Sequence, residues 1–162
     1  MTMPFNASEV FDIAVDIERD GAAFYRKAMG LVADEEMREE LRQLAEMEDA
    51  HEMTFTSLKK QFVGEQSDVD WFDPNGEAAG YLKNFASGQV FDMTVPPLDT
   101  LPANPSVHDI LSMALRREGD TVLFFTGVAN ALPDGEASQA IDTIIKQEMG
   151  HVTLLSNKLR NL

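Results

Sequence analysis

The chain contains no cysteine, and this absence excludes several kinds of chemistry. Without thiols it can form no disulfide, no thiolate metal site and no cysteine nucleophile. It also cannot hold an iron–sulfur or rubredoxin-type centre by itself.

Basic residues and long apolar runs are also scarce. The 13 Lys and Arg residues face 28 Asp and Glu residues, and the resulting net charge of -15 argues against a nucleic-acid partner. No stretch approaches the roughly eighteen apolar residues of a membrane-spanning helix. The first residues lack a basic region followed by an apolar run, so we expect no signal peptide and a cytoplasmic location. The acidity has two interpretations, which are solubility and attraction of cations such as Fe²⁺ to a buried site.

Two E-x-x-H steps stand out in what the chain does contain. Glu48 precedes His51, and Glu148 precedes His151, by three positions. Residues three apart on a helix share one face, so a carboxylate and an imidazole could grip one metal ion. Each step lies on an apolar stripe, formed by Met37, Leu41, Leu44, Ala45, Phe55, Leu58 and Phe62 or by Ala137, Ile141, Ile144, Ile145, Val152, Leu155 and Leu159. A buried Glu or His needs a partner, because a buried unpaired charge is very costly.

The same residues recur at an offset of one hundred. Glu18 stands thirty residues before Glu48, and Glu118 stands thirty residues before Glu148. Further pairs at this offset are Ala14/Ala114, Asp20/Asp120, Phe24/Phe124, Asp34/Asp134 and Glu36/Glu136. This pattern indicates an internal duplication. Four Glu and two His are the ligand set of a dinuclear carboxylate site in a four-helix bundle, and the alternative is that salt bridges satisfy each residue separately.

The third histidine provides a contrast. His108 has Pro105 three positions before it and lies near a predicted helix start. We interpret it as a surface or capping residue. We interpret Met29, Met37, Met47 and Met53 as residues that fill gaps in the core.

Helical periodicity and capping signals predict an all-α fold, with 1–162 forming a single domain. The predicted helices are 7–30, 34–62, 106–130 and 135–160, with starts signalled by Asn6-Ala-Ser-Glu9, Asp34 and Ser106-Val-His-Asp109. The stretch 64–105 is rich in Pro and Gly and is predicted to contain one short helix over 77–87. Short turns join the helices within each half into antiparallel hairpins. If an approximate two-fold axis relates the hairpins, 64–105 must be a long crossover to the far end of the third helix.

With these residues in view, the chain resembles the rubrerythrin-like branch of the ferritin-like superfamily over nearly its whole length. The residues that carry the resemblance are Glu18, Gly21, Tyr25, Glu48, His51, Glu118, Phe124, Phe125, Glu148 and His151. The resemblance implies a ferritin-like four-helix bundle with two Fe ions, bridged by Glu48 and Glu148. Glu18 and Glu118 would be terminal ligands, and each His would cap one iron. Carboxylate and imidazole also suit Mn, and Zn is a lesser candidate.

The resemblance also implies an activity, with two departures. The family includes peroxide reductases, oxidases and iron-storage proteins, so we expect an oxidoreductase that consumes H₂O₂ or O₂ and responds to oxidative stress. An external electron donor and a homodimer are expected too. Rubrerythrins carry another Glu three residues after the third-helix ligand, where this chain has Thr121, and a rubredoxin domain that needs Cys. Iron binding or storage without fast turnover, and a bundle that binds metal only for stability, are the alternatives.

Residues around the ligands have two interpretations each. Tyr25 lies two helical turns after Glu18 and is either a hydrogen-bond donor to a ligand Glu or a core aromatic. Asp20, Asp120 and Asp142 either orient the His rings or form surface salt bridges, and we favour salt bridges.

Overall fold

The computed structural model describes residues 7–65, 77–86 and 101–162, and within these ranges every regular element is an α-helix. The helices are α1 (Ala7–Met29), α2 (Glu35–Glu65), α3 (Glu77–Ala86), α4 (Val107–Ala131) and α5 (Glu136–Arg160). The bounds of the four long helices differ from the predicted ranges by at most three residues. None of the helices in the described ranges is both long and apolar enough to cross a membrane.

Side-chain caps explain where two of the long helices begin. The backbone N–H of Met37 donates to the Asp34 carboxylate over 2.8 Å, which confirms Asp34 as the N-cap of α2. At α4 the Asp109 N–H donates to the Ser106 hydroxyl, and the Ser106 N–H donates to the Asp109 carboxylate. This reciprocal pair is a capping box, and it confirms the helix start predicted at Ser106. The predicted cap at Asn6 lies outside the described residues.

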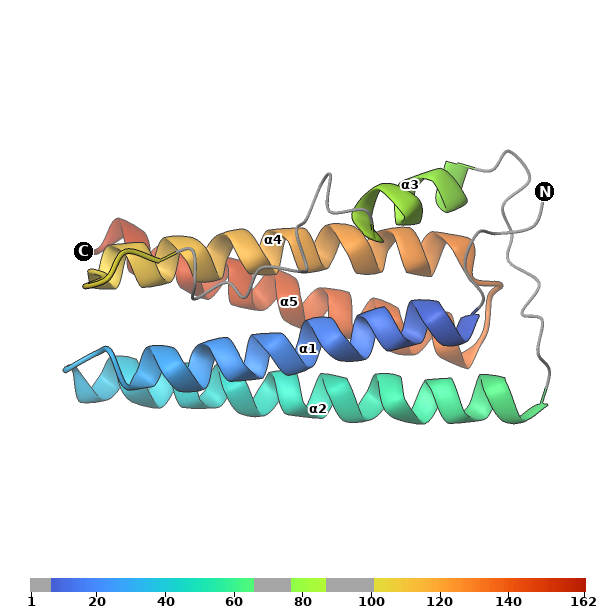
Figure 1. Ribbon diagram of the computed structural model, residues 1–162, viewed down its shortest axis with the longest axis horizontal. Helices are drawn as coiled ribbons and strands as arrows, with labels where there is room; N and C mark the ends of the chain where they lie inside the picture. Colours follow the sequence, from blue (N-terminus) through green and yellow to red (C-terminus); the bar gives the residue numbers. More distant parts are fainter. Residues whose placement is uncertain (1–6, 66–76, 87–100) are drawn as a thin grey trace.

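The four long helices lie side by side, as Figure 1 shows. α1 packs chiefly against α2, and α4 packs chiefly against α5. A short turn joins each pair, so the helices within a pair run in opposite directions (Figure 1). The end of α2 and the start of α4 lie at opposite ends of the molecule in the same view. Most of the predicted crossover 64–105 lies outside the described residues, so its path stays a prediction.

The short helix α3 packs on α4. The Tyr81 hydroxyl donates to the backbone oxygen of Leu123, and the Phe85 ring lies 5.6 Å from the Phe124 ring. Gly127 makes this contact possible, because a Cβ there would lie 2.2 Å from the Tyr81 ring. Leu82 and Phe85 are buried, whereas Tyr81 is half-buried. α3 therefore extends the core over one face of α4.

The apolar core consists of two clusters at different levels along the long helices. The first contains residues near the start of α1 and the end of α4, such as Phe11 and Phe125. The second contains residues near the end of α1 and the start of α4, such as Tyr25 and Leu111. The buried polar and charged residues of the described ranges all lie between the clusters in sequence on their helices: Glu18, Glu48, His51, Arg117, Glu118, Thr121, Glu148 and His151. The fold thus encloses one polar layer between two apolar ones.

Candidate metal centre

All six residues singled out by their spacing lie in this polar layer and are buried. Their exposed fractions range from 0% to 4%. Each long helix contributes: α1 and α4 supply one Glu each, and α2 and α5 supply one E-x-x-H step each. The E-x-x-H residues of one helix share a face, so both side chains reach the centre from adjacent turns.

The six side chains form two overlapping groups of potential ligands. One group is Glu18, Glu48, His51 and Glu148. The other is Glu48, Glu118, Glu148 and His151. Within each group one ligand atom from every residue lies within 4.8 Å of the others. Glu48 and Glu148 belong to both groups, so the arrangement has two positions for a cation that share two carboxylates.

Both imidazoles direct Nδ1 into the centre. His51 Nδ1 lies 2.7 Å from an oxygen of Glu148 and 3.4 Å from an oxygen of Glu18. His151 Nδ1 lies 2.9 Å from the other Glu148 oxygen. The two rings are stacked with centroids 6.1 Å apart. Each cation position therefore has its own imidazole nitrogen.

Several polar atoms in the centre are buried without a hydrogen-bond partner. They are both carboxylate oxygens of Glu18, Oε1 of Glu48, Oε1 of Glu148 and Nδ1 of His51. The 2.7 Å approach of His51 to Glu148 is close but not aligned as a hydrogen bond. Unpartnered buried polar atoms are costly, and a cation coordinated by these same atoms would satisfy them together. The donor set therefore fits a pair of metal ions.

In the metal-free protein, burial and mutual repulsion change the pKa values of the carboxyl groups. Burial and the nearby Glu148 charge raise the pKa of Glu18 well above its ordinary value. Burial, followed by the charges of Glu118 and Glu18, does the same to the pKa of Glu48. Burial also raises the pKa of Glu118. Without a cation, the centre therefore takes up protons.

Glu148 and the two imidazoles, in contrast, favour their charged forms. Burial disfavours the charged form of Glu148, but contacts with His151 and His51 outweigh burial and lower its pKa to about 2. Burial also opposes the charge of His151, but contacts with Glu118 and Glu148 raise its pKa to about 10. The pKa of His51 is raised too, because its contact with Glu148 outweighs burial. In the metal-free protein, the protonated imidazoles thus provide the positive charge that metal cations would otherwise provide.

Tyr25 contacts one of the six side chains directly. Its hydroxyl donates to Glu118 Oε1, and its ring is 1% exposed. Burial and the Glu118 charge raise the pKa of Tyr25 well above its ordinary value, so it stays protonated as a donor. Of the two interpretations from the sequence, the structure supports the donor. Phe125 stands at the repeat-related position and has no hydroxyl.

Two residues next to the centre, Arg117 and Gly21, have roles that their spacing does not predict, although Gly21 is among the residues that carry the resemblance. Arg117 is 5% exposed, and its Nη2 donates to the backbone oxygen of Ile17 over 3.3 Å. Gly21 leaves space for Glu48, because a Cβ at Gly21 would lie 2.4 Å from Glu48 Oε2. In the sequence, these residues are visible only as a glycine within a helix and an arginine that precedes Glu118. Neither feature by itself indicates a functional site.

The outward-facing ring nitrogens contact residues other than the proposed aspartates. His51 Nε2 lies 2.9 Å from Gln147 Oε1, and His151 Nε2 lies 3.4 Å from Met47 Sδ. Asp20 and Asp142 are exposed and Asp120 is half-buried. These contacts give no support to an orienting role for the three aspartates.

The burial of His108, Met37 and Met53 tests the roles inferred for them from the sequence. His108 is exposed, with Nδ1 3.4 Å from the Ser112 hydroxyl, which confirms a surface role. Met37 is 8% exposed and belongs to the core. The interpretation of Met53 as a core residue is wrong, because its side chain is 73% exposed. Helical periodicity itself argues against that interpretation, because Met53 and the buried Phe55 are two residues apart and therefore face nearly opposite sides of α2.

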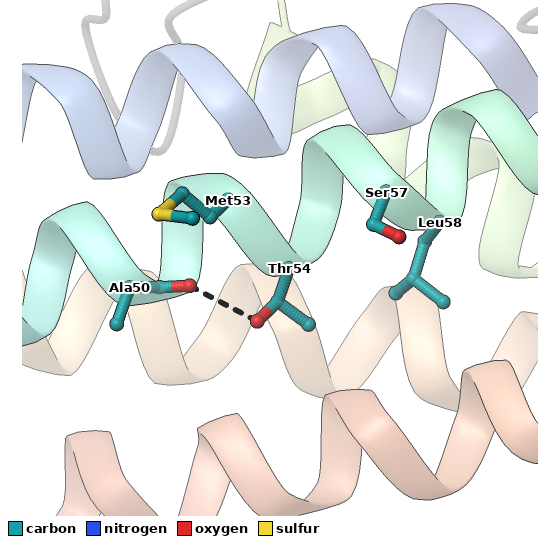
Figure 2. Close-up of a pocket in the computed structure, with 5 residues that line it drawn as sticks. All are labelled: Ala50, Met53, Thr54, Ser57 and Leu58. Carbon is teal, nitrogen blue, oxygen red and sulfur yellow. Dashed lines mark hydrogen bonds between the residues drawn. The ribbon is translucent and has the colours of Figure 1, made fainter.

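A surface groove on α2 includes Met53 but none of the six central residues. It is lined by Ala50, Met53, Thr54, Ser57 and Leu58. Figure 2 shows these side chains along one face of α2, where the Thr54 hydroxyl donates to the Ala50 backbone oxygen over 3.0 Å. The groove is therefore separate from the polar layer that holds the candidate metal centre.

Comparison with known proteins gives one informative likeness. The chain matches no protein-family model, and it matches no curated protein. A solved structure from Thermotoga maritima, described as a "putative ferritin-like diiron-carboxylate protein", has a TM-score of 0.70 at 18% sequence identity. The alignment covers 99% of this chain and 98% of that one. The two chains share a fold, which confirms the predicted all-helical, ferritin-like class, whereas the rubrerythrin-like branch stays a prediction.

Proposed function

We propose that the chain is a di-iron carboxylate oxidoreductase that reduces H₂O₂ or O₂ at the expense of Fe²⁺. The observation that carries the proposal is the pair of overlapping ligand groups, which share Glu48 and Glu148. The description of the Thermotoga structure as a diiron-carboxylate protein supports it. We propose further that the long helices form an antiparallel four-helix bundle with 64–105 as the crossover.

In this proposal each residue has a defined role toward the metal. Glu48 and Glu148 would bridge the two ions. Glu18 with His51 would complete one position, and Glu118 with His151 the other. Four carboxylates carry four negative charges, which two divalent ions neutralise when both imidazoles are uncharged. Carboxylate and imidazole ligands suit Fe or Mn, whereas Zn usually takes fewer ligands.

The surrounding residues suit a redox reaction in a dry site. Two bound Fe²⁺ ions would supply the two electrons that, with two protons, convert H₂O₂ into two waters. The apolar clusters above and below the polar layer exclude bulk water. The Tyr25 hydroxyl donates to Glu118 Oε1 and would hold this carboxylate in position beside the metal. Electrons that regenerate Fe²⁺ must come from an external donor, because the chain has no Cys for a rubredoxin-type centre.

Peroxide turnover tests the proposal. The protein is loaded with Fe²⁺ without oxygen, desalted and mixed with H₂O₂. We expect a rapid ferric absorption, consumption of peroxide and return to the ferrous state when a reductant is added. The Glu148→Gln variant, which changes one shared carboxylate, is expected to lose this response. Iron-loaded protein that shows no spectral change with either H₂O₂ or O₂ would refute the proposal.

A second candidate function is iron handling without fast peroxide turnover. Thr121 favours it, because this buried residue stands where rubrerythrins carry a further Glu. Iron content distinguishes the candidates: the oxidoreductase retains about two iron atoms per chain, whereas a storage protein accumulates many in an assembled shell. A homodimer, expected from the resemblance, is compatible with either and is measurable by light scattering.

A further inference from the structure

The two imidazoles have different partners on their outward-facing nitrogens. His51 Nε2 lies 2.9 Å from the amide oxygen of Gln147, and His151 Nε2 lies 3.4 Å from the sulfur of Met47. Gln147 and Met47 are one hundred positions apart, and each immediately precedes a shared glutamate. The repeat therefore places a strong acceptor beside one ring and a weak acceptor beside the other.

This difference affects the nitrogen that faces the metal. An amide oxygen that accepts from Nε2–H keeps the proton on Nε2, which leaves the lone pair of Nδ1 free for a cation. His51 Nδ1 is buried without a hydrogen-bond partner and points at Glu18 and Glu148. A thioether is only a weak acceptor, so Met47 holds the orientation and tautomer of His151 less firmly.

We propose that Gln147 is a positioning residue that selectively strengthens metal binding at the His51 position. The His151 position, with Met47 beside its ring, is then the more easily emptied of the two. This inference rests on the metal-binding part of the proposed function and requires no turnover. Under this inference, the two cation positions differ in metal affinity although their ligands are equivalent, and Gln147 causes the difference.

A reciprocal exchange between the repeats tests it. Zn²⁺ is diamagnetic, so titration of the metal-free protein with chelator-buffered Zn²⁺ can be followed through the ¹⁵N resonances of the His51 and His151 rings. Gln147→Met copies the Met47 environment, and Met47→Gln copies the Gln147 environment. Gln147→Glu keeps an acceptor oxygen at the same reach. Gln147 is exposed, so these changes at position 147 leave the core intact.

The expected results are specific to each ring. In the unmodified chain His51 should bind Zn²⁺ at a lower free concentration than His151. Gln147→Met should raise the midpoint for His51 by about tenfold or more, as loss of an outer-shell partner does elsewhere. Met47→Gln should lower the midpoint for His151, and Gln147→Glu should preserve that for His51. The melting temperature of metal-free Gln147→Met should equal that of the unmodified chain.

Three outcomes would overturn the inference, and they are distinguishable. If both rings bind Zn²⁺ but the His51 midpoint is the same in Gln147→Met, Gln147 has no positioning role and the proposed function is unaffected. If neither ring of the unmodified chain binds metal, the inference and the proposed function both fail. A fall in the metal-free melting temperature that accounts for the whole affinity change would also refute positioning, because it would indicate a purely structural role.

Discussion

Gly21→Ala should weaken metal binding although alanine ordinarily favours helices. Gly21 lies within α1, and an added Cβ would lie 2.4 Å from Glu48 Oε2 and 3.0 Å from Arg117 Nη2. Non-bonded heavy atoms prefer separations of about 3.5 Å, so the Glu48 carboxylate must move by about 1 Å. Glu48 belongs to both ligand groups, so one methyl group disturbs both cation positions.

The size of the expected affinity loss follows from the small ligand displacement that a metal site tolerates. Metal–ligand distances are held within about 0.2 Å, which is much less than the required displacement. We therefore expect at least about a tenfold loss of affinity, or about 1.4 kcal/mol. In the metal-free protein, a helix gain of about 0.5–1 kcal/mol for Ala over Gly offsets part of the clash. Stability without metal should thus change little.

Gly150→Ala provides the matched control. Gly150 lies within α5 between Glu148 and His151, and a Cβ there would meet nothing within 4 Å. This variant should gain about 0.5–1 kcal/mol in unfolding free energy and keep its metal affinity. Urea unfolding without metal and Zn²⁺ titration against a competing chelator measure the two quantities. Gly21→Ala that binds two Zn²⁺ ions as tightly as Gly150→Ala would refute the reasoning.

Three further predictions concern the stability of the protein with and without metal. Tyr25→Phe removes the hydroxyl that donates to Glu118, so its unfolding free energy should fall by about 1–3 kcal/mol in urea; an unchanged value would show that the bond contributes nothing. Saturation with metal at a hundred times the dissociation constant should raise the unfolding free energy by about 2.7 kcal/mol per site, whereas a melting temperature insensitive to chelators would contradict a site in the folded state. Folding raises the pKa of His151 from 6.5 to about 10, so the protonated imidazole stabilises the metal-free protein. This stabilisation is complete below about pH 6.5 and is lost as the pH rises towards 10. His151→Asn should remove that alkaline decline in unfolding free energy, and a decline of the same size in the variant would exclude His151 as its source.

The six residues of the polar layer could be singled out from the sequence because they obey local rules. A three-residue spacing fixes Glu48 and His51 on one helix face, whatever the helix packs against. The repeat at one hundred positions then identifies the second set without any contact information. The same local logic applies to the cap at Asp34, where a side chain bonds a backbone only three residues away.

Contacts between helices could not be predicted in the same way. The pairing of His51 with Gln147 depends on how α2 and α5 rotate about their axes, which no local pattern determines. The approach of Glu48 to Gly21 likewise depends on the separation of α1 and α2. The exposure of Met53 has a different cause, since it lies two residues before Phe55 on the opposite side of α2, where helical periodicity predicts exposure.

Anomalous scattering at the iron absorption edge, from crystals of protein loaded with Fe²⁺, tests whether these six side chains share two metal ions. Two peaks are expected between Glu48 and Glu148, one beside His51 Nδ1 and the other beside His151 Nδ1. Strong diffraction with no iron peak in the polar layer, and with the carboxylates and imidazoles bonded only to one another, would contradict the account.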